Sequence, residues 1–137
     1  MFCYCGGGWY TPGQTFKDVQ DEMRRHLDDG YTMVKMKVGG LPLAEDMKRV
    51  EAVKSILPSG TLLAVDANCK FQRDEGLAYA KALKQFDLRW FEEPCHWQND
   101  REDMAAVRML TGLPVVAGQS EITAQACRDL ITGMPRS

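Results

Sequence analysis

Residues 62–68, with the sequence LLAVDAN, combine a short apolar run with a polar end. The apolar part covers residues 62–65, and Asp66 and Asn68 follow it directly. Parallel strands that are covered on both faces have short, nearly continuous apolar sequences of this kind. The stretch therefore predicts a buried parallel strand whose carboxyl end carries polar side chains.

Similar short runs recur along the chain and alternate with segments of helical period. We expect strands at residues 1–5, 33–38, 62–66, 89–92 and 114–117. Between the strands, four apolar stripes of helical period indicate four helices. The stripes are Phe16, Val19, Met23 and Leu27; Met47, Val50, Val53 and Leu57; Leu77, Ala80 and Leu83; and Met104, Val107 and Leu110. A fifth helix is expected from Thr123 through Cys127 and Leu130 to Gly133. Such strict alternation predicts an α/β fold with a parallel sheet and right-handed crossovers.

Two architectures have this alternation, an open doubly wound sheet and a (β/α) barrel. Polar clusters end four successive strands, at residues 35–37 (KMK), 66–68 (DAN), 92–94 (EEP) and 119–121 (QSE). In barrels, functional groups converge at the carboxyl face from many strands, whereas a doubly wound sheet needs them only near its switch point. The clusters therefore favour part of a barrel of the TIM type. Residues 6–8 are three glycines, which we interpret as a flexible turn because no G-x-G-x-x-G motif follows the first strand.

Asp66 and Glu92 are expected at neighbouring strand ends that point toward a common axis. Two carboxylates at close quarters repel each other unless a proton or a cation lies between them, and Mg²⁺ prefers oxygen ligands. Lys35 and Lys37 share one face of their strand by alternation. Near a dication, two ammonium groups would lower each other's pKa, which makes a lysine useful as a base. The alternative for both pairs is a set of solvated surface charges.

Composition narrows the classes of partner. The chain has 137 residues and a net charge of −2, which does not indicate binding to nucleic acid or to an acidic membrane surface. The five cysteines are odd in number and scattered in spacing, so a disulfide framework or a zinc site is not expected and a reducing cytoplasm fits better. We expect each cysteine to be a small buried or half-buried residue, and His26, beside two arginines on a helix, to be exposed.

The ordered motifs VKMKVG (34–39), VDAN (65–68), WFEEP (90–94) and AGQSE (117–121) resemble the successive strand ends of the mandelate racemase and muconate lactonizing enzyme family of the enolase superfamily. The resemblance covers nearly the whole chain. It implies about five βα units of that family's eight-stranded barrel, at residues 1–133, with residues 134–137 as a truncated tail and the capping domain absent. A sheet with two open edges would be expected to self-associate as a homo-oligomer.

The resemblance also implies a reaction, in which a base removes the proton α to a substrate carboxylate and Mg²⁺ stabilises the enediolate. Lys37 would be the base, Lys35 would modulate it and contact the substrate carboxylate, and Asn68 would line the site. Asp66 and Glu92 would be metal ligands. The third ligand would be Gln119 by alignment or Glu121 by charge, and both remain open.

The implied substrate is a small-molecule carboxylate. The segment that follows Glu93-Pro94 resembles family members that dehydrate sugar acids, which favours a hydro-lyase. Two alternatives remain. One is a racemase, epimerase or cycloisomerase of the same family, and the other is an inactive barrel fragment with residual Mg²⁺ binding.

Overall fold

The computed structural model describes residues 3–97 and 100–133. Strands and helices alternate along the chain, as predicted, in the order β1 (Cys5–Gly7), α1 (Phe16–Asp28), β2 (Met33–Lys37), α2 (Leu43–Lys54), β3 (Leu62–Asp66), α3 (Arg73–Leu83), the 3-10 helix η1 (Lys84–Phe86), β4 (Phe91–Glu92), α4 (Asp100–Thr111), β5 (Val115–Val116) and α5 (Ala124–Gly133). The expected tail, residues 134–137, lies outside the described residues. None of the helices in the described ranges is long and apolar enough to cross a membrane.

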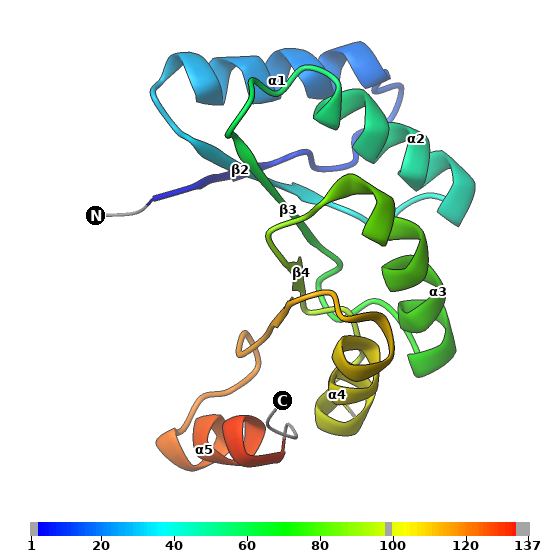
Figure 1. Cartoon of the computed structure of the whole chain (residues 1–137), viewed down its shortest axis with the longest axis vertical. Coiled ribbons are helices and arrows are strands. Elements are labelled where there is room, and N and C mark those ends of the chain that lie inside the picture. The colour runs from blue at the N-terminus through cyan, green and yellow to red at the C-terminus, as the bar shows by residue number, and fades with distance from the viewer. Residues whose placement is uncertain (1–2, 98–99, 134–137) are drawn as a thin grey trace.

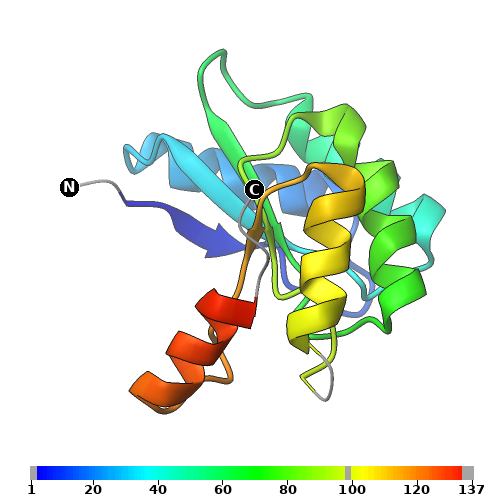
Figure 2. The same cartoon turned by 60° about the horizontal axis from the view of Figure 1, so that its bottom comes forward.

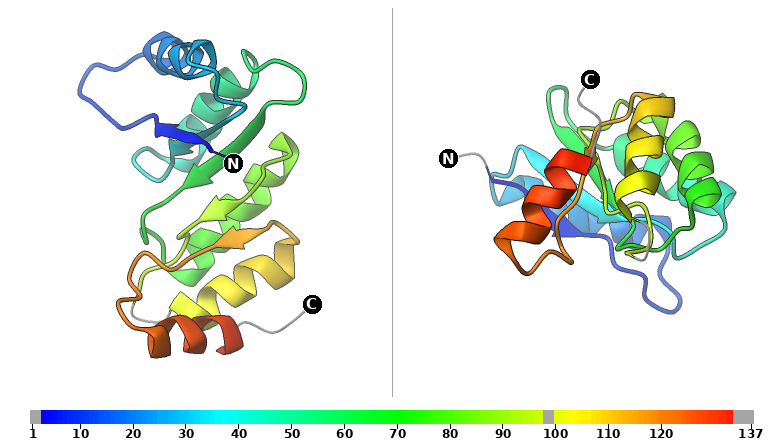
Figure 3. Two further views of the ribbon diagram at one scale, coloured as in Figure 1. Left: turned by 90° about the vertical axis from the view of Figure 1, so that its left-hand side faces the viewer. Right: turned by 90° about the horizontal axis from the view of Figure 1, so that it is seen from below.

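The five strands form one parallel sheet in the consecutive order β1-β2-β3-β4-β5. Figure 3 shows the strands following one another down the molecule in its left-hand view. Helices α1 to α4 succeed one another along one face of this sheet (Figure 1). A doubly wound sheet would carry helices on both faces, so this arrangement is that of a (β/α) barrel segment. The predicted α/β class and barrel architecture are confirmed.

Side-chain alternation separates the two faces of the sheet. Val34 and Met36 of β2 and Leu63 and Val65 of β3 point toward the helices and belong to the apolar core. The residues between them point to the opposite face, where Lys35 and Lys37 are half-buried and Asp66 is buried. The apolar packing therefore fixes which side chains reach the bare face of the sheet.

The bare face is concave. Tyr4 precedes β1 and Trp90 precedes β4, three strands apart, yet their rings meet edge-to-face with centroids 5.4 Å apart. In a flat sheet these strands would be separated by about 14 Å, because neighbouring strands lie about 4.8 Å apart. Side chains from distant strands can therefore converge over this face. In Figure 2, α3 and α4 lie to the right of the strands.

The first strand differs from its expected position. β1 covers Cys5–Gly7 rather than residues 1–5, of which Met1 and Phe2 lie outside the described residues. The glycines interpreted as a turn are part of this strand up to Gly7. Packing is close at the end of this strand, because a Cβ on Gly7 would overlap the Glu22 carboxylate and one on Gly8, just after β1, would lie 2.9 Å from Cβ of Met36.

Local capping explains where α1 begins, whereas burial does not follow every residue of the expected apolar stripes. Thr15 caps α1 in a reciprocal capping box with Asp18. On α4, however, Leu110 is 65% exposed although it was expected on the apolar stripe. Phe16 of α1 and Cys127 of α5 are likewise exposed. Each of these residues lies at the margin of a stripe, where the direction of the neighbouring element decides burial.

Gly8 offers a test of the close packing between the end of β1 and β2. Gly8 has φ +65°, and Gly60 has φ +86° with nothing within 4 Å of an added Cβ. Alanine incurs left-handed strain at both positions, but only at Gly8 does it also collide with Met36. We expect Gly8→Ala to lower the free energy of unfolding in urea by about 1–3 kcal/mol more than Gly60→Ala does. Equal losses would contradict the proposed role of Gly8.

Candidate active site and metal centre

The polar ends of β2, β3 and β4 lie in one row across the sheet. The strand register pairs Lys37 with Asp66 and Asp66 with Glu92. The next partner in the row is Val116 of β5, which carries no polar group. Lys35 points to the same face two residues before Lys37. Three neighbouring strands therefore bring four charged side chains to one place.

Direct contacts join these four side chains. Nζ of Lys35 lies 3.1 Å from Oδ2 of Asp66 and also donates to Oε1 of Glu92. Nζ of Lys37 donates to the same Oδ2 of Asp66 at 2.6 Å. The other carboxylate oxygen of Glu92 accepts from Nε1 of Trp90 at 3.0 Å. We call Lys35, Lys37, Asp66 and Glu92 the charge cluster.

Burial and hydrogen bonding compete within the charge cluster. Burial disfavours the charged form of Asp66, but hydrogen bonds from Lys37, the Asn68 backbone N–H and Lys35 outweigh it and hold the pKa of Asp66 below its ordinary value. Burial also opposes the charge of Lys35, yet hydrogen bonds to Glu92 and Asp66 raise the pKa of Lys35 above its ordinary value. The two carboxylates therefore favour the charged form of Lys35, and the lowered lysine pKa expected beside a dication stays a prediction.

Asn68 and Gln119 extend the charge cluster toward β5. Oδ1 of Asn68 accepts from Nζ of Lys37, and Nδ2 of Asn68 donates to Oε1 of Gln119 at 3.0 Å. Glu121 is half-exposed, and among the described residues its side chain has no hydrogen bond or ion pair with the charge cluster. The structure thus brings Gln119, and not Glu121, into contact with the other expected site residues.

Glu93 fixes the position of Gln119. Glu93 is buried, and its backbone adopts φ 42°, which turns the side chain away from the strand. Oε1 of Glu93 accepts from the backbone N–H groups of Gly118 at 2.6 Å and Gln119 at 2.7 Å. Its own N–H donates to Val116. The end of β4 therefore holds the loop that follows β5.

An aromatic side chain covers the other side of Lys37. Nζ of Lys37 lies 4.4 Å from the ring centroid of Trp9, which is 61% exposed. A pocket of about 320 Å³ opens here, lined by Trp9, Tyr10, Lys37, Val38, Gly39, Gly40, Ala67, Asn68 and Lys70. Pockets of this size are typical of small-molecule sites. The space next to Lys37 can therefore accept a small polar molecule that packs against Trp9.

Two buried charges on α2 hold the backbone behind Lys37, and sequence reasoning missed both. Arg49 donates to the carbonyl oxygens of Lys37 at 2.7 Å and Gly8 at 2.5 Å. Asp46 accepts from the N–H of Gly39 at 2.6 Å and from the hydroxyl of Tyr10 at 2.5 Å. These bonds tie the ends of β1 and β2 to one helix.

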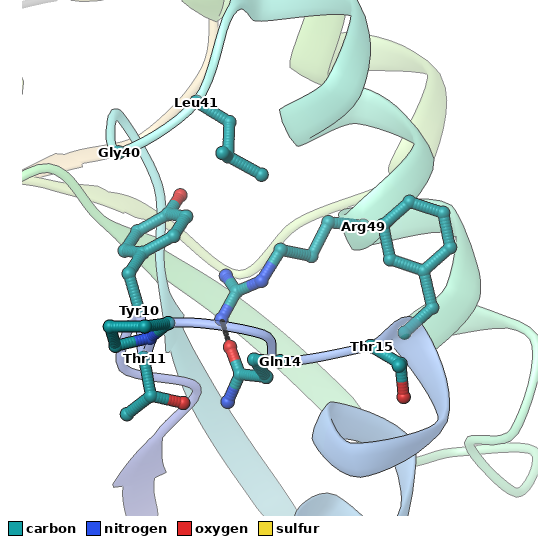
Figure 4. A pocket seen from close by; sticks show the side chains of 9 residues that line it. Tyr10, Thr11, Gln14, Thr15, Gly40, Leu41 and Arg49 are labelled. Atoms are coloured by element: carbon teal, nitrogen blue, oxygen red, sulfur yellow. Dashed lines mark hydrogen bonds between the residues drawn. The ribbon is translucent and has the colours of Figure 1, made fainter.

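Figure 4 shows Arg49 beside the Tyr10 ring, with its hydrogen bond to Gln14, at a second pocket of about 340 Å³. Burial, followed by the hydrogen bond to Asp46, raises the pKa of the Tyr10 hydroxyl, so Tyr10 remains a donor. The sequence did contain a signal of the two buried charges on α2. Asp46 and Arg49 share the helical spacing of the buried Val50 and Val53, so charged residues occupy core-facing positions.

The residues of the charge cluster have the chemistry of a magnesium site. The Lys35 ammonium already lies between Asp66 and Glu92, so this point accepts positive charge. Two carboxylates and the amide oxygen of Gln119 are the hard oxygen ligands that Mg²⁺ prefers. In the described ranges no group of three or more His, Cys, Asp or Glu residues is arranged to hold a metal ion. A third protein ligand here would have to be an amide or a side chain that moves.

Comparison with known proteins gives a family. Residues 18–133 match the family described as enolase C-terminal domain-like. A curated relative, the L-talarate/galactarate dehydratase of Salmonella typhimurium, is 31% identical over 134 residues, which are 96% of this chain and 32% of the relative. Dehydratases, racemases and a cycloisomerase are all among the relatives.

Solved structures of related proteins support the same family. A racemase from Streptomyces coelicolor A3(2) with bound magnesium has a TM-score of 0.85 and 32% identity, over 95% of this chain and 36% of that one. L-Talarate dehydratase from Polaromonas sp. JS666, complexed with Mg and L-glucarate, has a TM-score of 0.85 and 28% identity, over 94% of this chain and 36% of that one. The chain spans about a fifth to a third of the length of the curated relatives it matches.

The lowered pKa of Asp66 predicts an acid-dependent contribution to stability. A carboxyl group whose pKa is depressed on folding stabilises the fold above its unfolded pKa of about 3.9, and this stabilisation is lost as pH falls through the folded value. In Mg²⁺-free buffer near pH 7, Asp66→Asn should lower the free energy of unfolding by about 1–3 kcal/mol.

Urea denaturation at several pH values measures this difference. The gap between the unmodified chain and Asp66→Asn should begin to narrow below about pH 4 and should close only as pH falls through the depressed pKa of folded Asp66, where both side chains become neutral. Asp28→Asn, at an exposed position on α1, is the matched control and should change stability by less than about 0.5 kcal/mol. A gap that is independent of pH would show that the loss does not come from the charge of Asp66.

Proposed function

The chain belongs to the enolase C-terminal domain-like family, and from this we propose that it supplies the base and most of the metal ligands of a Mg²⁺-dependent site that removes the proton α to a carboxylate. The observation that carries the proposal is the convergence of Lys37, Asp66 and Glu92 on one row of the sheet, with Lys35 in contact with both carboxylates. The roles of the individual residues, and the substrate, are part of the proposal.

Asp66, Glu92 and Gln119 would hold the metal ion, with Glu121 as the alternative to Gln119. Bound Mg²⁺ would supply positive charge that stabilises the negative charge developing on the substrate carboxylate. With a dication bound, Asp66 and Glu92 would no longer neutralise the two ammonium groups. Repulsion between positive charges would then favour release of a proton from one lysine.

Lys37 would be that lysine, and it would take the α proton at Nζ. Its position supports this role, because it lines the pocket beside Trp9, whereas Lys35 does not line that pocket and contacts both carboxylates. Lys35 would keep its charge and contact the substrate carboxylate. Asn68, which hydrogen bonds Lys37 and Gln119, would contact the substrate or orient Lys37.

The substrate we propose is a sugar acid, and the reaction is dehydration, by analogy with the relatives that are sugar-acid dehydratases. Racemisation, epimerisation or cycloisomerisation begins with the same proton transfer and is the second candidate, favoured by relatives of those kinds. Self-association of the chain also remains a proposal. Apolar side chains such as Ile122, 95% exposed, and Ile131, 68% exposed, support it.

Solvent deuterium exchange tests the proposed base. In D₂O with Mg²⁺, a panel of sugar acids should include at least one that exchanges its α proton, detected by NMR. Lys37→Ala should slow this exchange by about 100-fold or more, because positioned general bases contribute about 10²–10⁴-fold. Lys81→Ala, at an exposed position on α3, is the control and should leave the rate unchanged. Exchange that survives Lys37→Ala would refute the assignment, and no exchange with any acid would favour an inactive fragment that retains Mg²⁺ binding.

Titration calorimetry with Mg²⁺ distinguishes the two candidates for the third ligand. We expect Gln119→Ala to weaken Mg²⁺ binding by about tenfold, or about 1.4 kcal/mol, because the side chain lies against Asn68 in the site. Glu121→Gln, which keeps the size of the side chain, should leave the affinity unchanged. The opposite result would assign Glu121 as the ligand.

A further inference from the structure

A second group of reactive side chains lies between β1 and α1, outside the charge cluster. We infer that Cys5, His26 and Glu22 form a reactive-thiol site, in which Cys5 attacks small soft electrophiles while His26 accepts its proton. Its residues come from the strand that precedes the Lys37 strand and from the helix that packs on it. The inference is independent of the proposed function.

The first contact is between the thiol and the imidazole. Sγ of Cys5 lies 3.3 Å from Nδ1 of His26, a separation that allows an S–H···N hydrogen bond. The His26 side chain is only 18% exposed, which corrects the expectation that it is exposed. Cys5 itself is half-buried, so the residue is partly open to solvent. A thiol next to a base is the arrangement that activates a cysteine nucleophile.

The second contact places a carboxylate on the far side of the imidazole. Nε2 of His26 is buried, has no hydrogen-bond partner within residues 3–97 and 100–133, and lies 3.8 Å from Oε1 of Glu22. The other oxygen of Glu22 accepts from the backbone N–H of Gly8 at 3.1 Å, which holds the carboxylate in place. When His26 takes a proton at Nδ1, the negative charge of Glu22 stabilises the imidazolium. The thiol, imidazole and carboxylate thus lie in the order of a catalytic triad, in which the imidazole takes the proton and the carboxylate stays ionised.

Gly7 makes room for this group. A Cβ on Gly7 would overlap the Glu22 carboxylate and lie 3.0 Å from Nε2 of His26. The site also faces away from the charge cluster. Tyr4, on the other side of the strand from Cys5, has its ring 5.4 Å from Nζ of Lys35. A group attached to Cys5 would therefore lie on the helix side of β1 and leave the Lys37 pocket open.

The chemical step is a substitution that balances without any further reactant. With iodoacetamide, the Cys5 sulfur forms a bond to the methylene carbon, the carbon–iodine bond breaks, and iodide leaves with the bonding electrons. The thiol proton passes to Nδ1 of His26. The chain supplies its own references, because Cys127 is exposed and Cys69 and Cys95 are buried.

Alkylation rates test the inference. The Cys3→Ser chain is treated with iodoacetamide near neutral pH, and peptide mass spectrometry follows each cysteine separately. Cys5 should react about tenfold faster than Cys127 although Cys127 is more exposed, because a positioned base assists only Cys5. In urea, where the contact with His26 is lost, the two rates should become equal. A folded Cys5 that reacts no faster than Cys127 would overturn the inference.

Variants of α1 distinguish proton acceptance by His26 from a change in the exposure of Cys5. His26→Gln should reduce the Cys5 rate about tenfold, and Glu22→Gln by a smaller factor, with Cys127 unchanged. Arg25→Gln, at an exposed neighbouring position, should leave the Cys5 rate as it was. If His26→Gln perturbed α1, Cys5 would become more exposed and react faster, and circular dichroism would report the loss of helix. An unchanged or increased Cys5 rate in a folded His26→Gln chain contradicts the inference.

Discussion

The ion pairs of the charge cluster are the interaction on which the arrangement of the site depends. Asp66 is 1% exposed, and a buried carboxylate is tolerated only when charged or hydrogen-bonding partners compensate for the loss of water. Lys35 and Lys37 provide that compensation from the neighbouring strand. The same contacts require β2, β3 and β4 to keep their register, because a shift by one residue would turn the lysines toward the apolar core. The fold and the site therefore both require the same strand register.

A second set of polar contacts fixes the backbone that carries these side chains. Arg49 and Asp46 reach from α2 to the ends of β1 and β2, and Glu93 reaches from β4 to the loop after β5. All three are buried charges that bind backbone groups, so they fix positions along the chain. The helices thus contribute to the site without touching the pocket beside Lys37.

The sequence predicted the features that depend on the strand period and on the order of the motifs along the chain. Lys35, Lys37, Asp66 and Glu92 could be placed on one face because strand alternation is strict and the motifs recur once per βα unit. It could not predict contacts that depend on how helices lie on the sheet. Asp46 and Arg49 occupy positions of an apolar stripe, and the glycines before Trp9 were interpreted as a turn although two of them belong to β1. Cys5 and His26 are 21 residues apart and belong to no motif, so only their shared strand–helix interface brings them together.

The central claim is that Lys37, Asp66 and Glu92 surround a single cation at the carboxyl edge of a concave sheet. Mn²⁺ has the same ligand preferences as Mg²⁺ and broadens the NMR signals of nearby nuclei. Titrating Mn²⁺ into the ¹⁵N-labelled chain should first broaden the amide signals of residues 37, 66–68 and 92–93, and excess Mg²⁺ should restore them. Residues 33 and 62, about 13 Å away at the opposite ends of the same strands, should broaden less at the same Mn²⁺ concentration. Broadening that is uniform, or that begins at another edge of the sheet, would contradict the account.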